Sequence, residues 1–417
     1  MAALAVPLAE SERIASLDAL RGFALLGILV MNIWAFSMPL AAYGNPNAYG
    51  SLEGPNWWAW FLSHLLFDQK MMTIFSMLFG VGVYVMASRA EARTGKSAAV
   101  HYRRMGWMLL FGLLHSYLLW VGDILFMYAV CGLLAYLLRG KSPRTLLITG
   151  VLVISVASLL SFFFGWSMQF WPAEEVEKMR NEYFRPPPEK INEEIAAYRG
   201  SWVEQVKYRA PVAFMVQTFF TLIWGLWRVG GLMLVGMGLF KLGVFSAERS
   251  KGFYWSLIAA GALAGIPLIL LGVQQNYAHN WDIRYSFFFG TQWNYWGSLL
   301  VSLAWIGAVM LMCKSGALGW LRRAYAAVGR MAFTNYLMQT LICTTIFYGH
   351  GLGLFGDVTR FGQVLIVLVV WMVQLLYSPL WLRHFHYGPF EWLWRSLTYR
   401  RAQPFRRTAP APAPAGA

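Results

Sequence analysis

The sequence predicts an all-α membrane protein that crosses the bilayer about ten times. Of its 417 residues, 58% are hydrophobic and only 13% are charged, and the mean hydropathy is +0.49. The apolar residues form many long runs, and about 20 consecutive apolar residues are enough to cross a bilayer as a helix. Lipid offers no hydrogen-bond partner to the backbone, so such runs are expected to be helical.

Ten apolar segments are candidate spans. In chain order they cover residues 14–38, 70–88, 105–122, 123–138, 145–170, 211–240, 252–273, 294–313, 331–348 and 361–382. The third and fourth are short, and only Gly122 and Asp123 mark the turn between them. The sixth is long enough to contain a break near Gly225 or Gly230.

Basic residues between the spans predict the orientation. With both ends of the chain in the cytoplasm, the cytoplasmic segments hold 23 of the 34 lysines and arginines, in agreement with the positive-inside rule. The net charge is +15, but the basic residues are interleaved with apolar runs. Nucleic-acid binders gather such residues on one face or arm, so no nucleic-acid partner is expected. The expected partners are membrane lipid and a small-molecule, lipid or sugar substrate.

Polar segments divide the chain into four predicted parts. They are an N-terminal half of five spans (1–170), a charged loop outside the cell (171–210), a C-terminal half of five spans (211–401) and a disordered Pro/Ala tail (402–417). Eight glutamates, seven basic residues and three consecutive prolines predict that the charged loop is a solvated, partly helical cap. Three segments are too short to span and suit helices in the membrane interface: 56–67, 317–330 and 391–401.

Polar side chains inside the spans are the candidate site residues. Such groups are costly in hydrocarbon and often functional, but they also bridge helices without taking part in chemistry. Asp18 and Arg21 stand three residues apart near the inner surface, either as a capping ion pair or as a mouth at which Arg21 meets an anion such as a phosphate. Asn32 lies about 16 Å further along the helix, where it either joins two helices or holds a substrate carbonyl.

His115 is the best candidate for a general base, because imidazole titrates near neutral pH. Asp123 follows eight residues later. On a continuous helix the two side chains would lie about 12 Å apart, whereas a turn before Asp123 would bring them closer. The alternative for His115 is a hydrogen bond between helices. The candidate catalytic residues are therefore His115, Asp123 and Asn32.

Arg228 is the clearest anomaly, because apolar residues flank it on both sides. Its charge requires an anion, and two sources are open. One is a carboxylate from another helix, for which Asp68 and Asp123 are available. The other is a bound substrate anion. Arg228 is therefore a candidate for substrate binding.

Three further polar residues are candidate substrate contacts. Lys70, with Asp68 before it, opens the second span as an interface pair or as part of a site. Asn335 and Gln339 share one face of the ninth span, where they bridge helices or contact substrate. No metal site is expected, because the three cysteines lie in apolar runs without CxxC spacing. The working expectation is that the scattered polar side chains line one wet chamber between the helices.

Five stretches of the sequence resemble the YeiB-like family of bacterial inner-membrane proteins, whose C-terminal half is a domain of unknown function. They are RIASLDALRGFALLGILVMNI, KMMTIFSMLFGVG, RRMGWMLLFGLLHSYLLWVGDILFMYAVCG, GRMAFTNYLMQTLICTTIFYGHGLGLFG and FHYGPFEWLWRSLTY. The resemblance covers most of the chain and implies a multi-pass protein of the bacterial inner (plasma) membrane. It implies no particular reaction.

More distantly, SLDALRG followed by Asn32 is similar to the first helix of the transmembrane acyltransferase superfamily, which includes the lysosomal heparan glucosaminide N-acetyltransferase. Those enzymes pass an acyl group from cytosolic acyl-CoA to an acceptor across the membrane. The similarity implies that Asn32 matches a catalytic asparagine. The histidine that follows it in the lysosomal enzyme is missing, since Tyr43 stands about where it would fall and the nearest outer histidine is His64.

The similarity implies an acyltransferase with acyl-CoA as donor. Asp18 and Arg21 would shape a mouth for the anionic acyl-CoA, and Asn32 would orient the acyl carbonyl. His115 would take a proton from the acceptor.

In the same scheme, Arg228 or Asn335 would stabilise the oxyanion. Two other functions stay open beside it. The first is a transporter or flippase for an anionic substrate, with Arg228 as the anion site and His115 with Asp123 as a proton relay. The second is a non-catalytic membrane partner that uses its outer cap for assembly.

Overall fold

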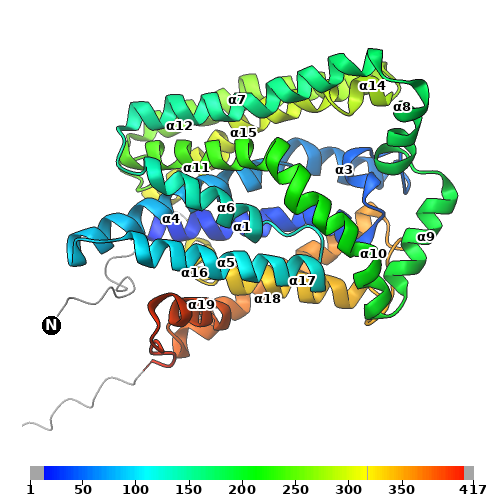
Figure 1. The fold of residues 1–417 in the computed structure, drawn as a ribbon. Helices are drawn as coiled ribbons and strands as arrows, with labels where there is room; N and C mark the ends of the chain where they lie inside the picture. The colour runs from blue at the N-terminus through cyan, green and yellow to red at the C-terminus, as the bar shows by residue number, and fades with distance from the viewer. Residues whose placement is uncertain (1–13, 317, 408–417) are drawn as a thin grey trace, which may run out of the picture.

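The computed structural model describes residues 14–316 and 318–407 and shows a bundle of helices, with no β-strand in those ranges. Most of the long helices run along a common direction (Figure 1). Helices α8 (Ala173–Met179) and α9 (Pro188–Arg199) lie at one end of the bundle, and α19 (Pro389–Tyr399) lies toward the other. The predicted all-α class is confirmed. Residues 408–417 of the predicted tail lie outside the described residues.

In the part of the chain that the structure describes, seven helical segments are long and apolar enough to cross a membrane. They are Ala15–Ser37, Pro55–Thr94, Pro143–Phe170, Trp202–Lys241, Lys251–Ala278, Ile283–Ser315 and Arg360–His384. Each overlaps one predicted span, so a membrane protein with several crossing helices is supported.

Several of these segments contain more than one helix. In chain order the elements are α1 (Ala15–Ser37), α3 (Pro55–Leu66), α4 (Lys70–Thr94), α7 (Pro143–Ser167), η3 (Met168–Phe170), α10 (Trp202–Met215), η5 (Val216–Gly225), α11 (Leu226–Lys241), α12 (Lys251–Ala260), η6 (Gly261–Gly265), α13 (Ile266–Ala278), α14 (Ile283–Ser286), α15 (Phe289–Ser315) and α18 (Arg360–His384). The break predicted near Gly225 takes the form of the π-helical stretch η5, which ends at that residue.

The other three predicted spans are helices that do not meet the length and apolarity that crossing requires. They are α5 (Ala98–Leu118), α6 (Leu125–Ala135) with the 3-10 turn η2 (Tyr136–Leu138), and α17 (Ala332–Phe347). α5 carries Arg103 and Arg104 in its second turn. The 16 residues of α17 reach only about 24 Å, less than the roughly 30 Å of the hydrocarbon core. The predicted total of ten crossings is therefore not confirmed, and the orientation of the termini stays a prediction.

The segments predicted as cap and interfacial helices are helical. The charged loop forms α8, the π-helical turn η4 (Arg180–Phe184), α9 and the start of α10. Ser201 and Glu204 form a reciprocal capping box that fixes the start of α10. The short interfacial segments correspond to α3, α16 (Gly319–Arg330) and α19, and a further short helix, α2 (Ala41–Gly44), follows α1.

Helix α1 lies inside the bundle, with α4, α15, α16, α17 and α18 packed around it. Its tightest contact is with α16, where two glycines meet. A β-carbon on Gly22 would lie 1.9 Å from the carbonyl oxygen of Tyr325, and one on Gly329 would lie 1.9 Å from that of Asp18. Only glycine permits so close an approach. The contact holds α16 beside Asp18 and Arg21.

Candidate ligand pocket

A cavity of about 230 Å³ lies among helices α1, α4, α5, α6, α16, α17 and α19. The antiparallel helices α1 and α4 form its long walls. Its lining runs from Ile14, the residue before α1, to Ile28 in α1 and from Arg89 back to Phe75 in α4, about 21 Å along each wall. We call this cavity the arginine pocket, after the five arginines in its lining: Arg21, Arg89, Arg104, Arg330 and Arg395.

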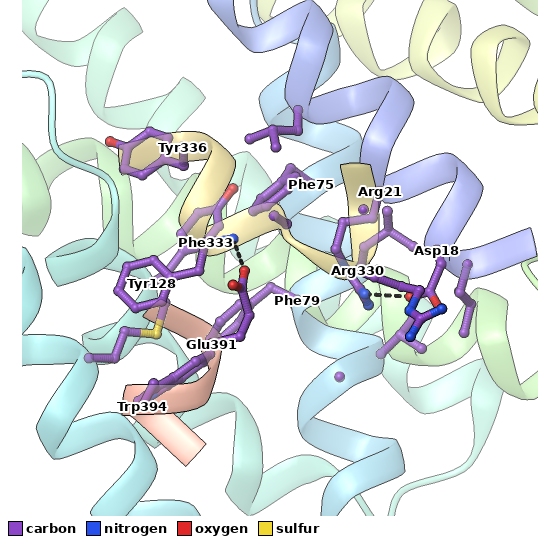
Figure 2. A pocket seen from close by; sticks show the side chains of 18 of the residues that line it. Asp18, Arg21, Phe75, Phe79, Tyr128, Arg330, Phe333, Tyr336, Glu391 and Trp394 are labelled. Atoms are coloured by element: carbon purple, nitrogen blue, oxygen red, sulfur yellow. Dashed lines mark hydrogen bonds and ion pairs between the residues drawn. The ribbon is translucent and has the colours of Figure 1, made fainter. Parts of the chain in front are cut away.

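The charged lining of the arginine pocket is mainly cationic. Five arginines face two carboxylates, those of Asp18 and Glu391, which leaves an excess of three positive charges when both acids are ionised. Asp18 accepts a hydrogen bond of 2.9 Å from Arg21, so the predicted pair is confirmed. Figure 2 shows Asp18, Arg21 and Arg330 together on one side of the pocket.

Glu391 is already bound to the start of helix α17. Its carboxylate accepts hydrogen bonds from the backbone N–H of Phe333 at 2.6 Å and of Thr334 at 3.0 Å, and from the Thr334 hydroxyl at 2.5 Å. The first N–H groups of a helix have no partner within the helix, and Glu391 supplies one. Burial raises the pKa of the Glu391 carboxyl, and the hydrogen bonds from Thr334 oppose that rise. Glu391 therefore fixes α19 against α17.

The remaining lining of the arginine pocket is largely apolar. Arg89 and Asp18 lie toward one end of the antiparallel walls, whereas Phe75 and Ile28 lie at the other end. Figure 2 shows the rings of Phe75, Phe79, Tyr128 and Phe333 around the space between them. Charge is therefore concentrated toward one end and hydrocarbon toward the other. A pocket of this kind suits a ligand with an anionic head and an apolar chain.

Asn32 continues the pocket-lining face of α1. The half-buried residues Arg21, Ile28, Asn32 and Ala35 are spaced by seven, four and three positions, so they share one side of the helix. Asn32 lies one turn beyond Ile28, which is in the lining. Its own side chain is outside the arginine pocket.

His115 and Asp123 lie outside the arginine pocket and contact each other directly. α5 ends at Leu118, and a turn brings Asp123 back so that its Oδ1 lies 2.8 Å from Nδ1 of His115. Nε2 of His115 lies 2.9 Å from the hydroxyl of Thr340, and the residue is only 2% exposed. Asp123 also accepts a 2.9 Å hydrogen bond from the backbone of Phe126. With both ring nitrogens engaged, His115 joins α5 to α17, and its role as a base stays a prediction.

Arg228 is buried, and of the two sources of an anion that the sequence left open, a carboxylate from another helix is not among its hydrogen-bond partners in the described residues. Its guanidinium donates to the carbonyl oxygen of Tyr295 at 2.9 Å and to the hydroxyls of Ser298 at 2.7 Å and Thr73 at 3.3 Å. It also lies 4.2 Å above the ring of Tyr295. Among the described residues, its hydrogen-bond partners are therefore neutral oxygens, and the alternative of a direct pair with Asp68 or Asp123 is wrong. Three acceptors and an aromatic face take the place of one anion.

Lys70 belongs to a cluster beside Arg228. Its amine donates to Asn294 and to the carbonyl oxygen of His64, both at 2.6 Å. Asn294 also donates to Asp68 at 2.8 Å. Lys70 is fully buried, so the alternative of a lysine that extends to the membrane surface is wrong.

Asn335 and Gln339 connect α17 to α18. The amide of Asn335 donates to Ser378 at 3.1 Å and accepts a hydrogen bond from Tyr377. Gln339 donates to Gln374 at 2.9 Å. Both amides bridge helices, and their substrate role stays a prediction.

The single wet chamber expected from the sequence is not found in the arginine pocket. Among the nine predicted site residues, only Asp18 and Arg21 belong to its lining. His115 is separated from it by Tyr336, which lines the pocket and lies 5.2 Å from the imidazole, ring centre to ring centre. The polar residues instead form a pocket and separate buried clusters, because each is satisfied by the helix next to it.

Four arginines of the pocket were not singled out by the sequence analysis. Each was a member of a basic segment at the predicted cytoplasmic side: Arg89, Arg104, Arg330 and Arg395. Three of them stand directly beside the end of a predicted span, and this position is the signal that would have identified them. A basic residue beside a span is near enough to reach into the bundle.

Comparisons with known proteins place the chain in a family. The family model "Protein of unknown function (DUF418)" matches residues 239–401. The chain is 34% identical to the Uncharacterized protein YeiB of Escherichia coli (strain K12), over 94% of this chain and 98% of that protein. It is 32% identical to the Uncharacterized protein YxaH of Bacillus subtilis (strain 168), over 96% and 98% of the two chains.

No solved structure matches the chain. The names of these relatives assign no reaction. The two alignments cover nearly the whole chain, so they extend beyond the DUF418 region and include the helices of the arginine pocket. The chain therefore belongs to the YeiB-like family of DUF418 membrane proteins.

Proposed function

We propose that the protein is a membrane-embedded acyltransferase that receives its acyl group from cytosolic acyl-CoA at the arginine pocket. The observation that carries the proposal is the division of one cavity between arginines at one end and hydrocarbon at the other. Acyl-CoA has the same division, with phosphates in its nucleotide part and an apolar acyl chain. Arginine binds phosphate oxygens in pairs and stays charged at every physiological pH.

In this proposal the phosphates bind at the mouth, near Arg21 and Arg330, and the acyl chain lies between Ile28 and Phe75. The cavity of about 230 Å³ is smaller than the roughly 300–1,000 Å³ of a pocket that encloses a whole ligand. It therefore encloses only the acyl end of the donor, so that the phosphates contact the arginines at the mouth from outside and the rest of the nucleotide part stays outside.

The proposed reaction transfers the acyl group from sulfur to oxygen or nitrogen. An acceptor hydroxyl or amine attacks the thioester carbonyl, the new C–O or C–N bond forms and the C–S bond breaks. The proton lost by the acceptor ends on the thiolate of coenzyme A. With the acyl chain between Ile28 and Phe75, the thioester carbonyl lies on the mouth side of Ile28, whereas Asn32 lies one turn beyond Ile28 on the same face of α1. This placement therefore gives Asn32 no contact with the carbonyl.

The proposed setting is the inner (plasma) membrane of a bacterium, with the mouth of the arginine pocket and both chain ends in the cytoplasm. The cluster of arginines at the mouth supports that orientation, because basic residues are retained on the cytoplasmic side. The acceptor would be an envelope sugar, a lipid or a metabolite.

A pocket-filling variant tests the proposal. A β-carbon on Gly82, in the pocket lining, meets no atom within 4 Å, and the same holds for Gly106 on α5, outside the lining. A side chain at Gly82 can therefore start into the pocket, midway along the α4 wall between Phe75 and Arg89, so Gly82→Leu should block the way to the chain site. Gly106→Leu serves as the matched control. We expect binding of radiolabelled palmitoyl-CoA to purified protein in nanodiscs to fall at least about tenfold in the first variant only. Equal affinity of the two variants would contradict the proposal.

A transporter or flippase for an anionic substrate is the second candidate. The observation in its favour is the ten-residue π-helix η5, which interrupts the helical segment immediately before Arg228 and α11. Interrupted helices near the middle of the membrane are frequent in transporters. In proteoliposomes loaded with acyl-CoA, a transporter would move labelled substrate without forming a covalent product. An acyltransferase would release free coenzyme A.

A further inference from the structure

Lys70 is the one buried lysine of the protein. All nine lysines of the chain lie in the described ranges, and the other eight are exposed or half-buried. Lys70 begins α4 and has 0% exposure. Its amine donates to two neutral oxygens, those of the Asn294 amide and the His64 carbonyl, both at 2.6 Å. A charged amine is costly in such a place unless an anion is close.

The nearby anion is reached through Asn294. While the Asn294 oxygen accepts from Lys70, its nitrogen donates to Oδ2 of Asp68 at 2.8 Å. The same Asp68 oxygen lies 3.0 Å from Nδ1 of His64. The other oxygen of Asp68 is buried and has no hydrogen-bond partner within residues 14–316 and 318–407. We call these four side chains, His64, Asp68, Asn294 and Lys70, the Lys70 network.

Arg228 adds a second buried cation to the same region. It is fully buried, its hydrogen bonds go to neutral oxygens, and its charge is close enough to act on Lys70. Two buried cations therefore share one carboxylate, that of Asp68. Tyr295 packs under the guanidinium of Arg228, and the neutral phenol of Tyr43 from α2 lies near Asp68. An unbalanced charge of this kind favours a state in which one group is neutral.

The Lys70 network ends at His64, a side chain that solvent can reach. The His64 side chain is 23% exposed, and its ring stacks on Trp60. Figure 1 places α3, which carries His64, toward the end of the bundle where α8 lies. Imidazole exchanges protons near neutral pH. A proton therefore has an entry point at the cap side of the molecule.

We propose that the Lys70 amine is a proton-binding site whose affinity for its proton is set by Asp68 and His64. One proton from water is gained or lost at the amine, and no other bond changes. With the proton bound, Lys70 and Arg228 share Asp68; with the proton lost, Arg228 is the only buried cation beside it. The site is separate from the arginine pocket and does not depend on acyl transfer.

Lysine-selective 13C and 15N labelling tests the proposal directly. The full-length protein in nanodiscs would be titrated from about pH 5 to about pH 10 and followed by magic-angle-spinning NMR of the lysine side chains. The Lys70 signal is assigned as the one that is missing in Lys70→Arg. If Lys70→Arg does not fold, Lys70→Met gives the same assignment. We expect one lysine signal to change at a pH separate from that of the other eight. A Lys70 signal that titrates together with them, or not at all, would overturn the proposal.

Two variants test the neighbours that set the proton affinity of the amine. Asp68→Asn removes the shared carboxylate and should shift the pH at which the Lys70 signal changes. His64→Gln, at the partly exposed end of the Lys70 network, should shift that pH as well. The exposed His279 provides a matched control as His279→Gln. Equal titration of Lys70 in all three variants and in the parent protein would also overturn the proposal.

Discussion

Asp123 turns back across the end of α5 so that its carboxylate lies 2.8 Å from Nδ1 of His115, and Nε2 of the same ring lies 2.9 Å from Thr340. The imidazole thus links a helix end, a turn and the interior of α17. His115→Ala would take one hydrogen bond from each of two buried side chains, Asp123 and Thr340, at a cost of about 1–3 kcal/mol. We expect a lower thermal unfolding midpoint with unchanged palmitoyl-CoA affinity. The exposed His279 gives the control, His279→Ala. An unchanged midpoint with lost affinity would show that His115 acts on the ligand.

Gly22 is predicted to be essential for the packing of α1 on α16. A β-carbon there would lie 1.9 Å from the Tyr325 carbonyl oxygen, so Gly22→Ala must separate two helices that line the arginine pocket. We expect a loss of stability of about 1–3 kcal/mol or more, measured by denaturant unfolding in detergent. Gly106→Ala meets no atom within 4 Å and should be neutral or slightly stabilising. Equal stability of the two variants would mean that the crossing is looser than described.

The charge at the mouth of the arginine pocket predicts salt-sensitive ligand binding. Arg330 belongs to the lining, whereas Arg323 on the same helix is exposed and lies outside it. Arg330→Gln should weaken palmitoyl-CoA binding by about tenfold and reduce its dependence on ionic strength, because one charged contact is lost. Arg323→Gln should change neither. The measurement is equilibrium binding at low and high salt, and identical salt dependence in both variants would count against a phosphate site at the mouth.

The cap is predicted to loosen as the pH rises. Glu194 on α9 accepts a hydrogen bond of 3.0 Å from the backbone N–H of Leu40, and burial raises its pKa to about 7. A carboxyl whose pKa is raised on folding stabilises the folded state below its unfolded pKa, and that stability is lost as the pH rises through the folded value. Hydrogen exchange of residues 188–199, corrected for its intrinsic pH dependence, should therefore quicken between about pH 5 and about pH 8.

Glu194→Gln should remove most of that pH dependence, because the amide carries no charge and still accepts from Leu40. Glu193 is exposed, so Glu193→Gln is the control that should retain it. If the parent protein and both variants show the same profile, the cap is not controlled by Glu194.

The sequence predicted the helical class and the positions of the crossing helices well, because length and apolarity alone determine where a chain can enter lipid. The pairing of Asp18 with Arg21 also followed from their spacing on one helix. The partners of Arg228 did not, since Ser298 and Tyr295 lie some 70 positions away in the chain. Neutral hydroxyls and carbonyls give no sequence signal that they will surround a charge.

The pocket itself was predicted only in part, for a related reason. Arg21 lies within a predicted span and was identified, whereas Arg104 and Arg395 lie in basic segments that also set the orientation of the chain. Basic residues beside the spans therefore either set the orientation of the chain or line the pocket. Only the packing of α5 and α19 around α1 and α4 shows which of them line the pocket. Long-range packing of this kind depends on close contacts such as that of Gly22 with Gly329.

Photolabelling tests the central claim most directly, namely that an acyl chain lies between α1 and α4 with its phosphates at the arginines. A palmitoyl-CoA analogue with a diazirine near the end of its chain would be irradiated on the protein in nanodiscs, and the adducts mapped by mass spectrometry. The account predicts adducts on the apolar lining near Ile28 and Phe75 that are lost in Gly82→Leu and retained in Gly106→Leu. Adducts confined to the lipid-facing surface, or unchanged by Gly82→Leu, would contradict it.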